Sequence, residues 1–133
     1  MPDGLFDGLH HNLAATLDLR QRQHELTASN IANADTPGYH ARVMEFDGLL
    51  ERMFSTSPEL QRTNERHLVG GGDTGAPTIT ELDPAPWSAD GNSVVAEREA
   101  GRLAENAVLY RSVSTGLSRR LALLRYAASD GRG

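Results

Sequence analysis

The sequence predicts a mainly α-helical protein in which long N- and C-terminal helices pair as an antiparallel coiled coil, with a loop-rich, partly extended middle segment between them. Apolar residues recur at helical spacing toward both ends of the chain, while glycine and proline gather in the middle. We therefore expect an N-terminal helix over 1–34, a turn, an extended arm and a short helix over 35–54, a flexible insert over 55–92, and a coiled-coil helix over 93–133.

The N-terminal helix is predicted from Leu5 to Asn33. Its apolar residues follow one another three or four positions apart, and the series turns polar at the centre of the helix. The apolar members are Phe6, Leu9, Leu13, Leu17 and Ile31, and the polar ones are Arg20, Gln23, His24 and Thr27. Because buried polar side chains need hydrogen-bonding partners, we expect this face to pack against other chains and not inside a monomer.

A tight turn is predicted directly after this helix, at Thr36–Tyr39. Pro37 cannot continue a helix, and it pushes the preceding Thr36 into an extended conformation. Pro37 stands at the second position and Gly38 at the third, where a positive φ is needed, so the four residues match a type II turn.

The segment after the turn is expected to hold short elements only. Loose alternation over His40–Phe46 predicts a strand or extended arm, and apolar spacing over Phe46–Phe54 predicts a short helix. Farther on, Gly70–Gly72 and four prolines forbid long regular elements, although a short strand fits Pro77–Leu82. Trp87 is either the anchor of this insert or a loop residue attached to a helix.

The C-terminal helix is predicted from Val94 to about Ser129, with Ser93 as its cap. Its apolar residues lie seven apart, as in a coiled-coil seam, and a second column of the seam includes polar residues. The columns are Leu103, Tyr110, Leu117 and Leu124, then Asn106, Val113 and Arg120, with Leu121 in an adjoining one. Asn106 and Arg120 either set the register of helix pairing or simply face solvent.

Composition argues against several classes of protein. With 38% hydrophobic and 5% aromatic residues among 133, the chain is lean for a large self-contained core. The net charge is −5 and all thirteen basic residues are arginine, so nothing indicates nucleic-acid binding. The chain has no cysteine, no apolar run long enough to span a membrane and no basic start of a secretory signal. By composition alone, this predicts a cytoplasmic protein.

No catalytic, cofactor or metal site is expected. The five histidines show no metal-binding spacing, since His10 and His11 are adjacent and point to different helix faces. Gly70–Gly72 lacks the lysine of a phosphate-binding loop. Glu97 and Glu99 lie two positions apart on a helix, where their carboxylates diverge.

A longer motif runs from Leu26 to Arg42 and reads LTASNIANADTPGYHAR. It closely resembles the N-terminal signature of flagellar basal-body rod and hook proteins, whose core is Asn-Ile-Ala-Asn-x-x-Thr-Pro-Gly-Tyr. The matching positions are Asn30, Ile31, Asn33, Thr36, Pro37, Gly38 and Tyr39. The resemblance implies that Asn30, Asn33 and Thr36–Tyr39 form a rigid corner, which redirects the chain from the first helix into an outward arm.

Other segments resemble the short proximal-rod subunit of that family. They are Tyr39–Phe46, Thr63–Leu68, and Asp90–Val94 followed by Glu97, Glu99, Asn106 and Tyr110. The run Ser93–Val95 departs from the pattern, because the family usually has a more polar run there, with an acid after the valine.

The resemblance implies a structural subunit of the proximal rod, part of the drive shaft that transmits torque from the membrane ring to the hook and filament. Expected partners are copies of the chain, other rod subunits, the membrane-ring protein FliF, the rod adaptor FliE and the flagellar type III export apparatus. A periplasmic rod location reached without a cleavable signal is also implied, with no cofactor, nucleic acid or direct membrane span. Residues expected to pack between subunits are Leu9, Leu13, Leu17, Asn106, Tyr110, Val113, Leu117, Leu121 and Leu124.

Three alternatives stay open on the sequence. Another short rod subunit of the same family has a similar length, but its motif usually carries extra residues around the Thr-Pro pair. A helical adaptor or export chaperone would also show two amphipathic helices, although it would fold and dimerise alone and would lack the Thr-Pro-Gly-Tyr corner. An enzyme would need a convergent set of polar residues, and the sequence shows none.

Overall fold

The computed structural model describes residues 3–55, 76–86 and 88–129, which form three helices and one two-stranded sheet. In chain order the elements are α1 (Asp3–Ala32), β1 (Arg42–Glu45), α2 (Asp47–Ser55), β2 (Thr78–Glu81) and α3 (Ala96–Ala128). This confirms the prediction of a mainly α-helical protein with long helices at both ends. None of the helices in the described ranges is both long and apolar enough to cross a membrane.

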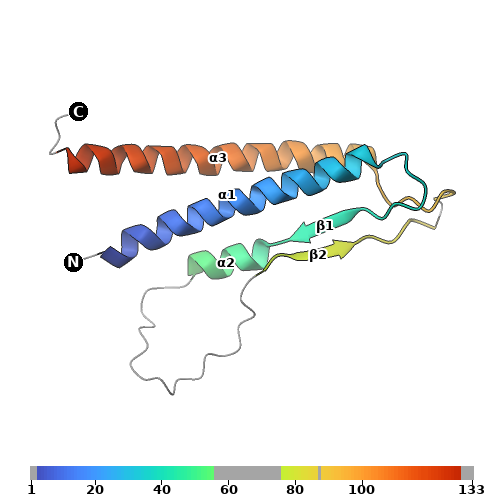
Figure 1. The fold of residues 1–133 in the computed structure, drawn as a ribbon, viewed down its shortest axis with the longest axis horizontal. Helices are drawn as coiled ribbons and strands as arrows, with labels where there is room; N and C mark the ends of the chain where they lie inside the picture. Colours follow the sequence, from blue (N-terminus) through green and yellow to red (C-terminus); the bar gives the residue numbers. More distant parts are fainter. Residues whose placement is uncertain (1–2, 56–75, 87, 130–133) are drawn as a thin grey trace, which may run out of the picture.

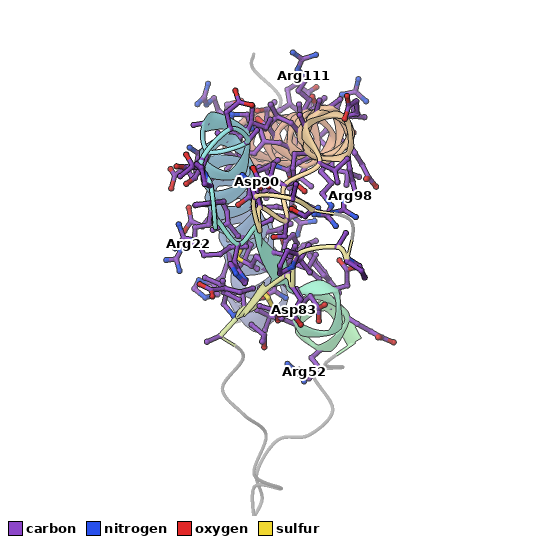
Figure 2. All side chains as sticks on the ribbon, turned by 90° about the vertical axis from the view of Figure 1, so that its right-hand side faces the viewer. Arg22, Arg52, Asp83, Asp90, Arg98 and Arg111 are labelled. Atoms are coloured by element: carbon purple, nitrogen blue, oxygen red, sulfur yellow. The ribbon has the colours of Figure 1, made fainter. Side chains whose placement is uncertain are left out.

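The two long helices lie side by side and run in opposite directions (Figure 1). Their ribbons are closest where α1 ends and α3 begins, and they spread apart toward the chain termini, which lie at the same end of the molecule. Figure 2 shows α2 and the two strands beneath the helix pair, as a second layer. The predicted antiparallel pairing is therefore present, while coiled-coil packing along its seam stays a prediction.

The second layer matches the short elements expected in the middle of the chain. β1 and β2 pair antiparallel, with Arg42 opposite Glu81. This confirms the extended arm predicted over His40–Phe46 and the short strand over Pro77–Leu82, and α2 confirms the short helix over Phe46–Phe54. Outside the described residues lie Trp87, Gly70–Gly72 and most of the predicted insert.

A small apolar core joins the two layers. Its buried members are Leu19, Met44 and Phe46, and Leu26, Leu49 and Leu50 pack against them. The guanidinium carbon of Arg20 lies 4.7 Å from the centroid of the Phe46 ring, within range of a cation–π contact. Burial lowers the pKa of Arg20, and the nearby carboxylates of Asp47 and Glu105 oppose that shift.

The polar centre of α1 is covered largely within the chain, so the expectation that it packs only against other chains is wrong. Thr27 is buried, and Arg20 packs on Phe46. Arg20 also donates from Nη1 to Oε1 of Gln23 over 3.2 Å. Only His24 of the four polar residues is exposed, because the second layer and α3 cover the rest of this face.

α3 begins at Ala96, two residues later than predicted, and Ser93 is not its cap. Val95 occupies the N-cap position in an extended conformation and makes no side-chain capping bond. Instead, Oγ of Ser93 accepts a hydrogen bond from the backbone N–H of Ala41, 2.7 Å away. A long-range contact therefore uses the side chain that the sequence predicts for local capping.

The seam of α3 carries polar residues where it faces α1. Asn106 is 3% exposed, and its Nδ2 donates to the backbone carbonyl of Arg20 over 2.8 Å. Asn106 therefore does not face solvent, which favours its interpretation as a residue that sets helix register. Arg120 is half-buried, and its Nε donates to Nε2 of His10 over 3.2 Å.

Replacing Phe46 with alanine should lower the free energy of unfolding by about 3 kcal/mol, because it empties the centre of a small core. Phe54→Ala is the matched control, since Phe54 is 48% exposed. Its truncation should change stability by about 0.5 kcal/mol or less. Urea unfolding followed by circular dichroism measures both variants, and equal losses would contradict this description of the core.

Candidate functional site

The motif residues meet at the end of the molecule where α1 stops and α3 begins. We call this region the corner, and it comprises residues 29–42 and 88–99 (Figure 1). Two backbone hydrogen bonds join its segments. The N–H of Gly38 donates to the carbonyl of Asp90 over 2.8 Å, and the N–H of Ser93 donates to the carbonyl of Tyr39 over 3.0 Å.

The turn at Thr36–Tyr39 has the features of the predicted type II turn. The N–H of Tyr39 donates to the carbonyl of Thr36 over 3.2 Å, and Gly38 has a φ of +70°. Gly91, with a φ of +71°, lies against it, and a Cβ added to Gly91 would be 3.7 Å from the Cα of Gly38. Side chains would strain the backbone at both positions, so the corner depends on two facing glycines.

Asn30 connects three elements through one side chain. It is fully buried, with 0% of its surface exposed. Its Oδ1 accepts from the N–H of Arg42 over 3.0 Å, and its Nδ2 donates to the Arg42 carbonyl over 2.8 Å. The remaining bonds are Nδ2 to Oε2 of Glu99, over 3.0 Å, and the Tyr39 hydroxyl to Oδ1, over 3.3 Å. All four hydrogen-bonding capacities of the carboxamide are therefore used.

Glu99 brings α3 into this arrangement as a buried charge. Besides the bond from Asn30, its Oε1 lies 2.7 Å from Nη1 of Arg102, one turn farther along α3. A buried carboxylate is tolerated when it is paired and hydrogen-bonded, and both conditions are met here. The first turn of α3 is thereby held against the last turn of α1.

Asn92 closes the C-terminal end of α1. Its Nδ2 lies 2.9, 2.9 and 2.8 Å from the backbone carbonyls of Asn33, Ala34 and Thr36. These three residues follow the last residue of α1, so the amide holds the chain where it leaves the helix. Its Oδ1 accepts from the N–H of Val94 over 2.7 Å, which fixes the approach to α3.

Asp90 holds Asn92 in place from an exposed position. Its Oδ1 accepts from the backbone N–H of Asn92 and from the Ser88 hydroxyl, each over 3.0 Å. These hydrogen bonds favour the carboxylate and lower the pKa of Asp90 below its ordinary value. The carboxylate therefore keeps its charge, and its hold on the loop, at neutral pH.

The structure brings most of the predicted motif residues together in the corner. Asn33 donates from Nδ2 to the Ser29 carbonyl over 2.8 Å, and its Oδ1 accepts from the Thr36 hydroxyl over 3.3 Å. Ile31 is half-buried beside them. The residues predicted to pack between subunits do not gather at one place, because they extend along the two long helices. They are Leu9, Leu13 and Leu17 on α1, and Asn106, Tyr110, Val113, Leu117, Leu121 and Leu124 on α3.

Sequence reasoning missed the residues that complete the corner from the C-terminal half. The sequence predicts Ser93 as a local helix cap and Glu99 as one of two diverging acids, and neither prediction brings these residues to the end of α1. The turn-forming residues Asp90–Ser93 indicate a turn, but they do not indicate which distant residues their side chains contact. In the described part of the chain, no three His, Asp or Glu side chains come together where they could hold a metal ion. The corner can fix the relative positions of α1, β1 and α3.

Asn30→Asp should lower the free energy of unfolding by about 3–5 kcal/mol at pH 7, because it places a second carboxylate 3.0 Å from that of Glu99 in a buried site. Two carboxylates so close cannot both stay ionised, so the folded variant binds a proton more tightly than the unfolded chain, whose carboxyl pKa values are about 4. The loss should therefore shrink as the pH falls from about 7 toward 5. Urea unfolding at several pH values measures this dependence.

The double variant Asn30→Asp with Glu99→Gln is the control for charge repulsion. A glutamine at this position can donate to the new carboxylate, so the double variant should regain more than half of the lost stability at pH 7. A loss that is independent of pH, or that persists in the double variant, would count against direct repulsion at this site.

Comparisons with known proteins agree with the motif and extend beyond it. A family model for flagella basal body rod proteins matches residues 12–40, which cover most of α1 and the turn. The flagellar basal body rod protein FlgB of Cereibacter sphaeroides is 38% identical over 115 residues, covering 86% of this chain and 87% of that protein. FlgB of Escherichia coli K12 is 35% identical over 111 residues, covering 77% and 79%. FlgB of Salmonella typhimurium is 34% identical over 113 residues, covering 79% and 81%. The chain therefore belongs to the family of the flagellar basal body rod protein FlgB.

Proposed function

We propose that this chain is a structural subunit of the proximal part of the flagellar basal-body rod. The rod serves as the drive shaft that transmits torque from the membrane ring to the hook and filament. The single observation that carries the proposal is the corner, because it joins the family motif to α3 through hydrogen bonds of defined direction. A load-transmitting subunit needs such a fixed joint more than it needs an open cleft.

The corner supports this role because its polar groups are satisfied inside the chain. Asn30 uses all its donors and acceptors, and Asn92 joins the residues that follow α1 to Val94, just before α3. Removing a partner from a buried polar group costs about 1–3 kcal/mol, so small displacements of the joint are opposed. The corner therefore sets the angle between the helix pair and the second layer.

Packing between subunits is proposed along the long helices. Leu121, Leu124 and Tyr110 expose apolar surface on α3, and Leu9 and Leu13 are half-buried on α1. Neighbouring chains in a rod can cover this surface, and each fully covered leucine contributes about 1.5–3 kcal/mol. Leu17, Val113 and Leu117 are half-buried and would complete the same faces. Asn106 differs, since it is already buried against α1 and would act by fixing register inside the subunit.

The proposed partners are copies of this chain and other rod subunits, together with the membrane-ring protein FliF and the rod adaptor FliE. We also propose that the flagellar type III apparatus exports the chain to the periplasmic rod without a cleavable signal. The family consists of structural rod proteins, and we assign the chain no catalytic activity and no cofactor. Membership in the family and the small core, which suits burial between subunits, support these assignments.

A strain that lacks the chain should not swim, and expression of the natural sequence should restore swimming. Gly38→Val should fail to restore it, because a β-branched residue at a φ of +70° strains the turn by at least about 1–2 kcal/mol and misdirects the arm. Swimming in soft agar and electron microscopy of isolated basal bodies measure the outcome.

Gly116→Ala is the matched control, because Gly116 lies within α3 and a Cβ there meets no atom within 4 Å. It should swim like the natural strain. A deletion strain that swims would refute the rod function. Full swimming with Gly38→Val would instead refute the role of the corner alone.

A further inference from the structure

We propose that an ordered water molecule is bound between α1 and α3, where it accepts a hydrogen bond from Nε of Arg20 and donates one to Oδ1 of Asn106. Both residues lie outside the corner, so the site is a second polar contact between the same two helices. The inference goes beyond the proposed function and does not rest on it, because the site is formed within one chain.

The two atoms that would bind the water are buried, and neither has a hydrogen-bond partner among the described residues. Other groups of the same side chains are already bonded. Nδ2 of Asn106 donates to the Arg20 carbonyl over 2.8 Å, and Nη1 of Arg20 donates to Oε1 of Gln23 over 3.2 Å. Turning the carboxamide over would bring Oδ1 against the Arg20 carbonyl, where two acceptors repel each other. Oδ1 is therefore the atom that needs a donor from elsewhere.

A cavity of about 240 Å³ reaches both residues from the side of the second layer. Its lining includes Thr27 of α1, Met44 of β1 and Asp47 of α2. Arg20 and Asn106 also line a hollow of about 160 Å³, which is otherwise formed by α1 and α3. Because a water molecule takes about 30 Å³ in the liquid, the cavity has room for one beside the two atoms.

The chemistry of the two atoms selects water over an ion. Nε of Arg20 carries a donor hydrogen and Oδ1 of Asn106 is an acceptor, and one water molecule can serve both. An anion would be repelled by Oδ1, and a metal cation would be repelled by the guanidinium group. Charges of both signs line the cavity in equal number: Arg20, Arg42 and Arg102, and Asp47, Glu99 and Glu105.

The cavity also offers the further polar atoms that a buried water needs. Such waters make about three hydrogen bonds with groups that would otherwise be unsatisfied. Gln23 and Thr27 line the same cavity, and Thr27 is itself buried. A carboxamide or a hydroxyl group can therefore supply the third contact after Arg20 and Asn106.

The bound water adds a contact between the long helices. Asn106 then bonds to α1 through both ends of its carboxamide, directly to the Arg20 carbonyl and through the water to the Arg20 side chain. A bridging water is enthalpically almost as good as a direct hydrogen bond, so both buried atoms are satisfied. Sliding α3 along α1 would break the two contacts together, and the hydrated pair therefore opposes a change of helix register.

A high-resolution crystal structure of the natural chain tests the site directly. We expect an electron-density peak within about 3.2 Å of both Nε of Arg20 and Oδ1 of Asn106. A structure without this peak, or one in which the two atoms bond to each other, would overturn the inference. This measurement needs no substitution, so it does not depend on whether a variant folds.

Two variants show whether Asn106 holds the water. Asn106→Leu removes one of the two binding atoms, so the peak should disappear from its crystal structure. Thr16→Val is the matched control, because Thr16 is also buried, at 4% exposure, but does not line the cavity. Its hydroxyl donates to the Asn12 carbonyl over 2.7 Å, and the peak should remain in this variant. A peak that persists in Asn106→Leu would contradict the assignment.

Nuclear magnetic resonance supplies a second measurement, in solution. The Nε–H proton of Arg20 should show a through-space cross-peak to a long-lived water, whereas that of Arg22, which is exposed on α1, should not. Asn106→Leu should lose the Arg20 cross-peak and Thr16→Val should keep it, with circular dichroism confirming the helix content of both. Equal cross-peaks from Arg20 and Arg22 in the natural chain would count against a bound water.

Discussion

The buried carboxamide of Asn30 holds α1, β1 and α3 together, and β2 then pairs with β1. It exchanges two hydrogen bonds with the backbone of Arg42, as a neighbouring strand would, and donates a third to Glu99. One side chain near the end of α1 therefore places β1 on one side and α3 on the other. Because the amide has no spare donor or acceptor, these contacts form together, and the loss of any one leaves a buried polar group unsatisfied.

Away from the corner, some buried polar atoms between α1 and α3 have no hydrogen-bond partner. Nε of Arg20 and Oδ1 of Asn106 are buried and have no hydrogen-bond partner within the described residues. Each such atom costs free energy, and the nearby core of Leu19, Met44 and Phe46 has little apolar surface to offset it. The ribbons also spread apart toward the termini. The helix pair is therefore anchored mainly at one end, and its other end gains most from contacts with further chains.

The sequence could predict what depends on neighbouring residues. Pro37 and Gly38 determine the turn locally, and apolar spacing places both long helices and α2 to within about two residues. The contacts of Asn92, Ser93 and Glu99 could not be predicted, because Glu99 lies 69 positions from Asn30, and Ser93 lies 52 from Ala41. Local sequence rules predict that a serine just before a helix caps it, but the Ser93 hydroxyl instead accepts a hydrogen bond from the distant Ala41. The cover of Arg20 within the chain could not be predicted for the same reason, because the Phe46 ring that packs on it comes from the second layer.

The chain separates two kinds of interaction along its length. Hydrogen bonds at the corner are directional, so they specify one geometry before any neighbour is present. Apolar contacts are not directional and scale with the area covered, so Leu123 and Tyr126 at the far end contribute free energy only when another surface meets them. The angle between the layers is thus a property of the single chain, whereas the stability of its helix ends depends on assembly. A subunit built this way can enter an array without changing the joint that sets the geometry of the array.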